Sequence, residues 1–380
     1  MAKELEQTRG SFKLKGLVKG IDRDNAYEEG VRPDGKYAGT TYRKLNIGLQ
    51  TDPSNQVRLG LFSYEPEEVF MWNSTKKQKN KDYKGERIPF DEYLNKKEVL
   101  KENGTAVLQS RVGVEYDEKG KLQSEGLTSF EASEMIYDNI DNDDGAFIEG
   151  QISYSSFKNQ AGDDVTGTNY NIDKFFKAKS PFDLDDEEYD VQNYYEQQFV
   201  YIDSMIDKAN KKLLVTGRVI DYRKNTIDTT FVVNYGDDPD MGKLAKNINK
   251  KFKFGDLMTV YGEILNQTVE TEVEDEEDDD VLSSLGGKAK PNYATRANVS
   301  YNREMTIDGV AQWEKGFYSV EDFEENGLVV EEKESKKKDD LTNELGGKSK
   351  KKQEDPFDDF DDEDPFLDSD DDDNDDLMPF

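Results

Sequence analysis

The sequence contains no cysteine and no histidine. Without cysteine, the chain can form neither disulfide bonds nor a thiolate-based zinc site. Without histidine, it lacks the commonest general base and the commonest ligand for transition metals. We therefore expect no enzyme active site, no catalytic residue, no cofactor and no bound metal.

Long apolar runs are also missing. No stretch approaches the ~20 apolar residues that a membrane-spanning helix needs. The first ten residues, MAKELEQTRG, lack the apolar core of a signal peptide. We expect a cytoplasmic protein that does not act at a membrane, with residues 1–10 as a flexible leader.

Basic residues are too few to balance the acids, so the net charge is −33. The excess is concentrated in residues 181–190, 270–280 and 354–380, which contain no Lys or Arg and account for −30 of that charge. Residues 1–130, by contrast, contain 23 basic and 21 acidic residues. The body of the chain can therefore bind phosphates although the whole chain is acidic.

Three early segments, 11–22, 40–50 and 55–64, alternate apolar and polar residues with the period of a β-strand. Aromatic rings interleaved with cations on the polar face would suit single-stranded nucleic acid, because bases stack on rings and phosphates need cations. The simpler interpretation is a solvated face with a few aromatic residues of no special role. The residues expected on this face are Lys13, Lys15, Lys19, Tyr42, Lys44, Arg58, Phe62 and Tyr64.

A basic segment follows within residues 65–128. Trp72 precedes six cations, and we expect a long basic loop here, with Trp72 stacking on a base and the cations holding phosphates. The cations are Lys76, Lys77, Lys79, Lys81, Lys84 and Arg87.

The remaining elements of residues 11–180 suggest an architecture. Residues 105–116 read as a strand, 130–140 as a helix capped by Ser129, and 146–157 and 169–176 as strands. Strands, then one helix, then strands is the layout of an OB-fold, a five-stranded partly open barrel. We expect residues 11–180 to form one such barrel, with 65–128 as its insertion.

A second module is expected over residues 195–325, after an acidic linker at 181–194. Segment 211–223 repeats the phase of the first strand, with Gly217 and Val219 matching Gly16 and Val18. Residues 199–206 could be a strand or part of the connection. We expect a second OB-fold with an acidic insert at 269–292 and a closing strand near 303–310.

The second module also offers candidate contacts to nucleic acid. Tyr222 is the expected stacking residue. The expected phosphate contacts are Arg218, Lys243, Lys246, Lys250, Lys251 and Lys253.

Residues 326–380 should form a disordered acidic tail, because a block of like charge cannot collapse on itself. Its last residues are Asp375, Asp376, Leu377, Met378, Pro379 and Phe380. This ending resembles the C-terminal tip of bacterial and phage single-stranded DNA-binding proteins. The resemblance implies that the tip binds a replication or recombination protein: a polymerase, helicase, primase or recombinase.

The sequence thus predicts a mainly β protein of tandem OB-fold barrels with short helices and loop insertions. The two-module layout resembles a bacteriophage replication protein, which would bind single-stranded DNA in the host cytoplasm during DNA replication, recombination and repair. Two other functions remain open: an acidic DNA mimic or inhibitory protein-binding module, and a phage structural or assembly protein. RNA also remains open as a ligand.

Overall fold

The computed structural model describes residues 3–158, 164–271 and 298–325. The protein is mainly β, as the sequence predicts. Its elements are β1 (Gly10–Lys19), β2 (Tyr27–Val31), β3 (Thr41–Asp52), β4 (Asn55–Tyr64), β5 (Glu68–Asn73), α1 (Ser74–Lys79), β6 (Glu86–Pro89), α2 (Phe90–Glu102), β7 (Thr105–Val107), β8 (Ser110–Tyr116), β9 (Leu122–Leu127), α3 (Ser129–Asn139), β10 (Gly145–Lys158), β11 (Asp164–Lys177), β12 (Asn193–Asp207), β13 (Lys212–Ile220), β14 (Thr226–Asn234), α4 (Pro239–Lys251), β15 (Leu257–Gly262), β16 (Ile264–Thr271), β17 (Asn298–Met305), β18 (Gly309–Glu314) and α5 (Val320–Glu325).

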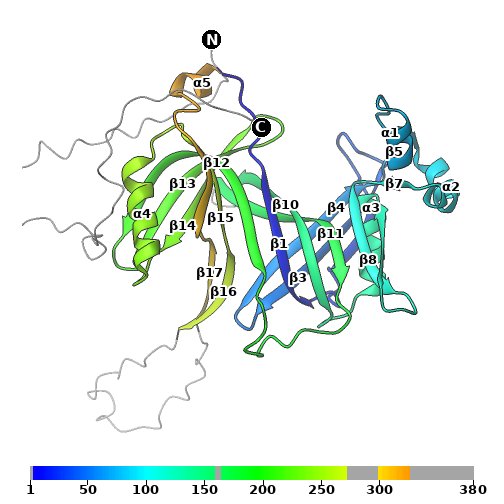
Figure 1. The fold of residues 1–380 in the computed structure, drawn as a ribbon, viewed down its shortest axis with the longest axis horizontal. Coiled ribbons are helices and arrows are strands. Elements are labelled where there is room, and N and C mark those ends of the chain that lie inside the picture. Colours follow the sequence, from blue (N-terminus) through cyan, green and yellow to red (C-terminus); the bar gives the residue numbers. More distant parts are fainter. Residues whose placement is uncertain (1–2, 159–163, 272–297, 326–380) are drawn as a thin grey trace, which may run out of the picture.

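Most strands belong to one mixed sheet of fifteen strands, and β5, β6 and β7 form a separate three-stranded sheet. The large sheet runs through the middle of the molecule, with α4 at one end and the small sheet at the other (Figure 1). Within it, two sets of strands close on themselves. We call these the first and the second strand circuit.

The first strand circuit consists of β1, β3, β4, β11 and β10. β1 pairs with β3 and β10, β3 with β4, and β10 with β11, all antiparallel. The circuit closes through a parallel bridge between Gly60 of β4 and Asn171 of β11. α3 enters between the third and fourth of these strands in the chain.

Alternation explains the core of this circuit. In the middle of β1, β3 and β4, alternate residues are buried and mostly apolar, including Leu14, Leu45 and Leu59. Gly16 lies where β1 crosses β3, and a Cβ there would lie only 2.1 Å from the carbonyl oxygen of Gln50. A side chain at this position would force the two strands apart, so the crossing requires glycine.

α3 closes one side of the core and confirms the predicted helix, with a correction at its start. The N-cap is Thr128, not Ser129. The hydroxyl of Thr128 accepts a hydrogen bond from the backbone N–H of Glu131, and the Glu131 carboxylate accepts one from the backbone N–H of Thr128. This capping box satisfies two N–H groups that the helix itself cannot bond.

Residues 65–128 do not form the expected loop. They fold into the three-stranded sheet, α1, α2, β8 and β9, and much of this insert surrounds a small core of its own. Val69, Met71, Phe90 and Val107 are buried there, and Phe130 of α3 joins them. The prediction was wrong because the strands of the small sheet have only three to six residues, too few to show a clear period beside so many charges.

The second strand circuit repeats the same plan. β12 pairs with β13 and β15, β13 with β14, and β15 with β18, all antiparallel. A parallel bridge between Val232 and Thr306 closes it, and α4 lies between β14 and β15 in the chain. The two circuits are continuous, because β12 also pairs with the start of β1.

This plan corrects the sequence alignment of the two modules. The first strand of the second circuit is β12, so residues 199–206 belong to a strand. β13, which contains Gly217, is the second strand of its circuit, whereas β1 is the first strand of the other. The alignment of Gly217 and Val219 with Gly16 and Val18 therefore matched strands that are not equivalent. The strand that pairs with β15 is β18, later than the expected 303–310. Residues 303–305 of that range belong to β17, which forms a hairpin with β16, and only residues 309–310 belong to β18.

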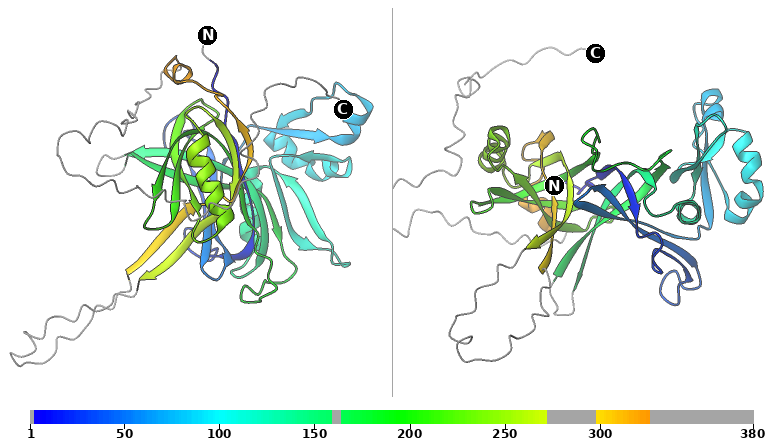
Figure 2. Two further views of the ribbon diagram at one scale, coloured as in Figure 1. Left: turned by 60° about the vertical axis from the view of Figure 1, so that its left-hand side comes forward. Right: turned by 90° about the horizontal axis from the view of Figure 1, so that it is seen from below.

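The start of the chain is part of the second circuit's packing. Leu5 is fully buried with Val200, Ile220 and Phe323. The hydroxyl of Thr8 accepts a hydrogen bond from the backbone N–H of Ile220. Residues 3–9 are therefore packed on the fold, and the expectation of a flexible leader was wrong for them. In Figure 2 this segment runs from the N-terminus towards β1.

Candidate nucleic-acid interface

One face of β1, β3 and β4 carries the eight residues that the sequence grouped together. The strand register pairs Tyr42 with Tyr64, Lys44 with Phe62, and Gly48 with both Arg58 and Lys19. Side chains alternate along a strand, so all these residues point away from the core. We call this the β1/β3/β4 face, defined by Lys13, Lys15, Lys19, Tyr42, Lys44, Arg58, Phe62 and Tyr64.

Aromatic rings gather at one end of this face. The ring of Phe62 meets that of Tyr64 edge-on, with centroids 5.1 Å apart, and lies 5.9 Å from that of Tyr42. Phe62 is 49% exposed although it is apolar. An exposed aromatic cluster of this kind is more informative than a single exposed apolar residue, because it offers several stacking surfaces together.

Sequence reasoning missed a fourth ring, that of Tyr37. This residue lies in the loop between β2 and β3, and its ring stacks on Tyr64 with centroids 4.4 Å apart. The only sequence signal was an aromatic residue beside a lysine in a Gly-rich loop, which does not reveal where the loop folds.

The cations of the face differ in how far they are already paired. Three cations of the face are exposed and form no ion pair or side-chain hydrogen bond within the described residues: Lys13, Lys44 and Arg58. Lys19, in contrast, forms an ion pair with Asp143. Exposed cations without partners are the ones that can neutralise phosphates at the lowest cost.

A carboxylate borders the aromatic end. Glu28 of β2 accepts a hydrogen bond from the hydroxyl of Tyr42. This bond, which stabilises the protonated phenol, raises the pKa of Tyr42 above its ordinary value. Tyr42 therefore remains neutral at physiological pH, and its ring carries no charge that would repel a phosphate.

Lys15 is occupied by the acidic linker. Residues 181–192, which we call the strap, run against β1, and the Nζ of Lys15 donates to the carbonyl oxygen of Asp190 at 2.8 Å. The same ammonium lies 4.4 Å from the ring centroid of Tyr189 and 5.1 Å from that of Phe182. Lys15 is therefore held by the strap in this structure. It could contact a phosphate, as expected, only if the strap moved away.

The strap also brings carboxylates to the face. Leu184, Asp183 and Asp185 line a cavity of about 260 Å³ together with Leu17 of β1 and Gln50 of β3. All six acids of the strap are exposed. The β1 side of the face is thus more negative than its β3 and β4 side.

Trp72 and the basic segment lie on the separate three-stranded sheet. The Trp72 ring lies 5.5 Å from that of Tyr83, and Lys77 Nζ is 5.8 Å from the Trp72 ring. Lys76 forms an ion pair with Glu86 at 2.6 Å. The other cations of the segment are exposed: Lys79, Lys81, Lys84 and Arg87.

In the second circuit, Arg218 already has an acidic partner. Its guanidinium makes two hydrogen bonds to the carboxylate of Asp228, at 2.6 and 2.8 Å, and is largely buried. A bidentate partner of this kind leaves little capacity for a phosphate. Tyr222 is 66% exposed, but it lies in the turn between β13 and β14 instead of on a sheet face.

Four of the five expected lysines near residues 243–253 lie on α4 and the fifth follows it, at the end of the molecule away from β3 and β4 (Figures 1 and 2). Lys243 is 3.9 Å from Asp240, and Lys253 is exposed. The remaining lysines of the set are Lys246, Lys250 and Lys251. They form a second basic surface, which the structure does not bring together with the β1/β3/β4 face.

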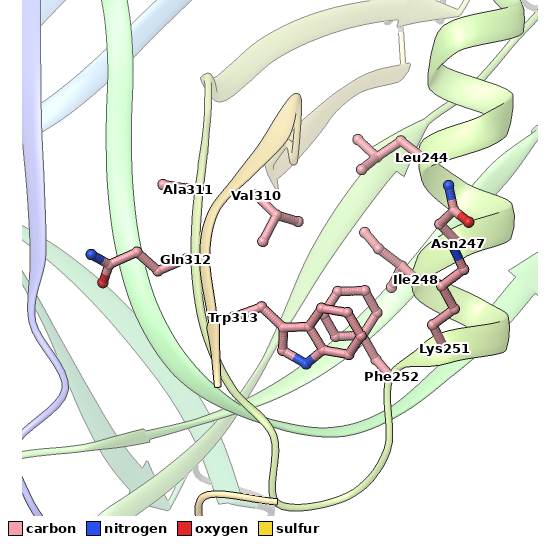
Figure 3. A pocket seen from close by; sticks show the side chains of 9 residues that line it. All are labelled: Leu244, Asn247, Ile248, Lys251, Phe252, Val310, Ala311, Gln312 and Trp313. Carbon is pink, nitrogen blue, oxygen red and sulfur yellow. The ribbon is translucent and has the colours of Figure 1, made fainter. Parts of the chain in front are cut away.

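A pocket of about 420 Å³ lies between α4 and β18 (Figure 3). Phe252 and Trp313 form its floor with ring centroids 4.3 Å apart, and Lys251 stands at its edge. The indole N–H of Trp313 donates to Asp256. The pocket is apolar with one cation, and it contains no set of groups for acid–base chemistry.

Other kinds of site find no support in the described part of the chain. Residues 3–158, 164–271 and 298–325 contain no group of acidic side chains arranged to hold a metal ion. None of their helices has the length and apolar character needed to cross a membrane. The acidic insert beyond residue 271 and the tip at Asp375–Phe380 lie outside the described residues.

The chain belongs to the YorF family, whose model matches residues 86–343, about two thirds of the sequence. A search of curated proteins finds no match. One similar solved structure is a deletion mutant of the single-stranded DNA binding protein from Thermus aquaticus. The similarity covers 82% of this chain and 96% of that chain, with 8% identity and a TM-score of 0.33. At this TM-score the similarity carries no argument about the fold or the interface.

Proposed function

We propose that this protein binds single-stranded DNA without sequence preference through the β1/β3/β4 face. The observation that carries the proposal is the cluster of one exposed and two half-buried rings beside unpaired cations on one sheet face. Stacking on such rings contributes about 1–3 kcal/mol per base and accepts any base. The cations beside the rings supply the attraction to phosphates, which falls as salt rises.

The strand plan supports this proposal. Each circuit contains five strands in the order first, second, third, fifth, fourth, with a helix before the fourth. A parallel bridge links the third strand to the fifth in the first circuit, and to Thr306, just before the fifth strand, in the second. We propose that both circuits are OB-folds, a fold that binds oligonucleotides on its second and third strands. β3 and β4, which carry Tyr42, Phe62 and Tyr64, occupy these two places in the first circuit.

We propose further contacts beyond this face. Trp72 and the exposed cations of the insert would extend the path past the end of β4. Tyr222 and the α4 lysines would form a separate contact, because they lie on the second circuit. Two linked contacts would raise the affinity through effective concentration.

The wider role rests on residues 375–380. We propose that this acidic tip, which ends in Pro-Phe, binds a polymerase, helicase, primase or recombinase, so that the protein organises single-stranded DNA during phage replication, recombination and repair. In this role the protein binds its ligand and performs no catalysis. Removing residues 354–380 should abolish capture of such a partner while the β1/β3/β4 face still binds DNA.

The decisive experiment measures the affinity of the full chain for fluorescent oligo-dT with Phe62→Ala and Tyr64→Ala combined. We expect binding to weaken by about tenfold or more, since at least one stacked base is lost. Tyr222→Ala, on the second circuit, tests whether that turn contributes. An unchanged affinity for the double variant would remove the face from the site.

Salt and strandedness separate the other functions. Oligo-dT binding should weaken between ~50 and ~300 mM salt, and duplex DNA should bind less tightly. An acidic DNA mimic would show no affinity for oligo-dT at either salt concentration. An assembly protein would form stable oligomers whose formation does not depend on DNA.

A further inference from the structure

The loop that joins β2 to β3 projects beside the aromatic end of the β1/β3/β4 face. Its base is closed by two backbone hydrogen bonds, from Gly39 N–H to Arg32 and from Arg32 N–H to Thr40. Gly35 and Gly39 each have φ of 81°, and a Cβ on either would meet nothing within 4 Å. The positive φ of the backbone therefore requires glycine at both positions, whereas close packing does not. Both glycines lie in open space at the surface.

A single ring contact ties this loop to the sheet. Among the described residues, the stack of Tyr37 on Tyr64 is the only ring contact, ion pair or hydrogen bond by which a side chain of residues 32–40 reaches β3 or β4. Tyr37 is nevertheless 43% exposed. The loop can therefore lift its one aromatic residue without breaking another ring contact, ion pair or side-chain hydrogen bond to β3 or β4.

Another tyrosine pair shows that the geometry alone does not define a site. Tyr27 and Tyr137 stack with centroids 4.7 Å apart and an angle of 15°, close to the 4.4 Å and 19° of Tyr37 and Tyr64. Tyr27, however, belongs to β2, a strand paired with β3, and Tyr137 belongs to α3, the helix that closes the core. Those rings cannot separate without moving a helix, whereas Tyr37 needs only its loop.

Two lysines lie close to the Tyr37–Tyr64 pair. Lys36 Nζ lies 5.3 Å from the centroid of the Tyr37 ring. Lys44 pairs across the strands with Phe62, the residue that contacts Tyr64 edge-on. Phosphates on both sides of an inserted nucleotide would therefore meet positive charge.

We propose that Tyr37 and Tyr64 form a slot for one unpaired base, and that the loop opens to admit it. Insertion replaces one ring–ring stack by two ring–base stacks, so the exchange favours the bound state. A base in a duplex has both its faces covered by neighbours and cannot enter. The slot thus adds to the proposed function, on which it rests, a structural reason for preferring single strands.

The test places 2-aminopurine, whose fluorescence falls when it stacks, at successive positions of oligo-dT and titrates the full chain. Because binding has no sequence preference, the protein binds in many registers, and quenching should appear at interior positions in general. Tyr37→Ala and Tyr37→Leu should reduce this quenching and weaken binding about five- to tenfold. Tyr37→Phe retains the ring and should behave as the unmodified chain.

Tyr137→Ala is the matched control, because it removes an equally exposed and equally stacked tyrosine from α3. It should leave both quenching and affinity unchanged. Oligo-dT binding that is insensitive to Tyr37→Ala, or an equal loss in Tyr37→Ala and Tyr37→Phe, would overturn the slot and leave the proposed function standing. No binding of oligo-dT by the unmodified chain would overturn both.

Discussion

The two strand circuits share one plan of pairing and differ in the surface they build on it. In the first circuit, the second and third strands present Tyr42, Phe62, Tyr64 and unpaired cations. In the second circuit, the corresponding strands are β13 and β14. Their outward face pairs Arg218 with Asp228 and Thr216 with Thr230, and it carries no aromatic residue. The strand plan is therefore not enough for nucleic-acid binding, which depends on the side chains of one face.

The largest effect should come from removing a core ring of the second circuit. Phe231 is fully buried and stacks on Phe199 with centroids 4.5 Å apart. Phe231→Ala should lower the free energy of unfolding by about 3–5 kcal/mol through the cavity it leaves. Chemical denaturation measures this loss. At low temperature, where the variant remains folded, its oligo-dT affinity should match that of the unmodified chain.

The reverse outcome for Phe231→Ala would change the comparison. A large loss of affinity in the folded variant would show that the second circuit contributes directly to binding. Because β12 pairs with β1, we also expect a single unfolding transition for both circuits. Two separate transitions would show that they fold independently.

Charge reversal on the first circuit should have the next largest effect. Lys44→Glu combined with Arg58→Glu should weaken oligo-dT binding by tens of fold at ~50 mM salt. Two fewer phosphate contacts should also reduce the magnitude of the slope of log affinity against log salt concentration by about 1.4. The matched control reverses Lys119 and Lys208, which are exposed in two hairpin turns. An equal loss in the control would indicate an effect of net charge alone.

Neutralising the strap should strengthen binding by a smaller factor. Replacing Asp183, Asp185 and Asp186 by Asn removes three carboxylates from the β1 side of the face. We expect an affinity gain of a few fold at low salt that disappears at ~300 mM, because exposed charges are screened. Neutralising three acids on α2, Asp91, Glu98 and Glu102, is the control. If both variants gain equally, the strap has no local effect.

The smallest effects should come from one substitution beside each circuit, in β2 and between β15 and β16. Arg43, hydrogen-bonded to Glu29, holds the pKa of Glu29 below its usual value, so this carboxylate stabilises the fold above its unfolded pKa and loses that effect on acidification. Burial raises the pKa of Glu263, so its charged form destabilises the fold until acid protonates it. At pH 7, Glu29→Gln should lower Tm slightly and Glu263→Gln should raise it. Both differences should shrink near pH 4, and shifts of the same sign would contradict the assignment.

Alternation made much of the β1/β3/β4 face predictable. Antiparallel pairing of the two segments that form β3 and β4 in this register places four side chains on one side of the sheet: Lys44, Arg58, Phe62 and Tyr64. The turn residues between the segments favour such a pairing. Tyr37 could not be found in this way. It lies in a loop, and only the fold brings its ring onto Tyr64.

The second circuit was harder to predict for a related reason. Gly217 and Val219 repeat the phase of Gly16 and Val18, but phase is a local property that many strands share. The place of β13 in the circuit depends on β12, a long strand that pairs with three partners along its length. Partner choice is decided by contacts between residues far apart in the chain, which a local pattern does not contain.

The sequence by itself determined the mainly β character, the position of α3, the outward set on three strands and the separation of acidic segments from a nearly neutral body. These follow from periodicity and charge counts, which are local. Tertiary structure decided that residues 65–128 fold, that Arg218 is paired and that the strap holds Lys15. It also decided that Tyr37 covers Tyr64. Each of these depends on which distant groups meet, and that is settled only when the core closes.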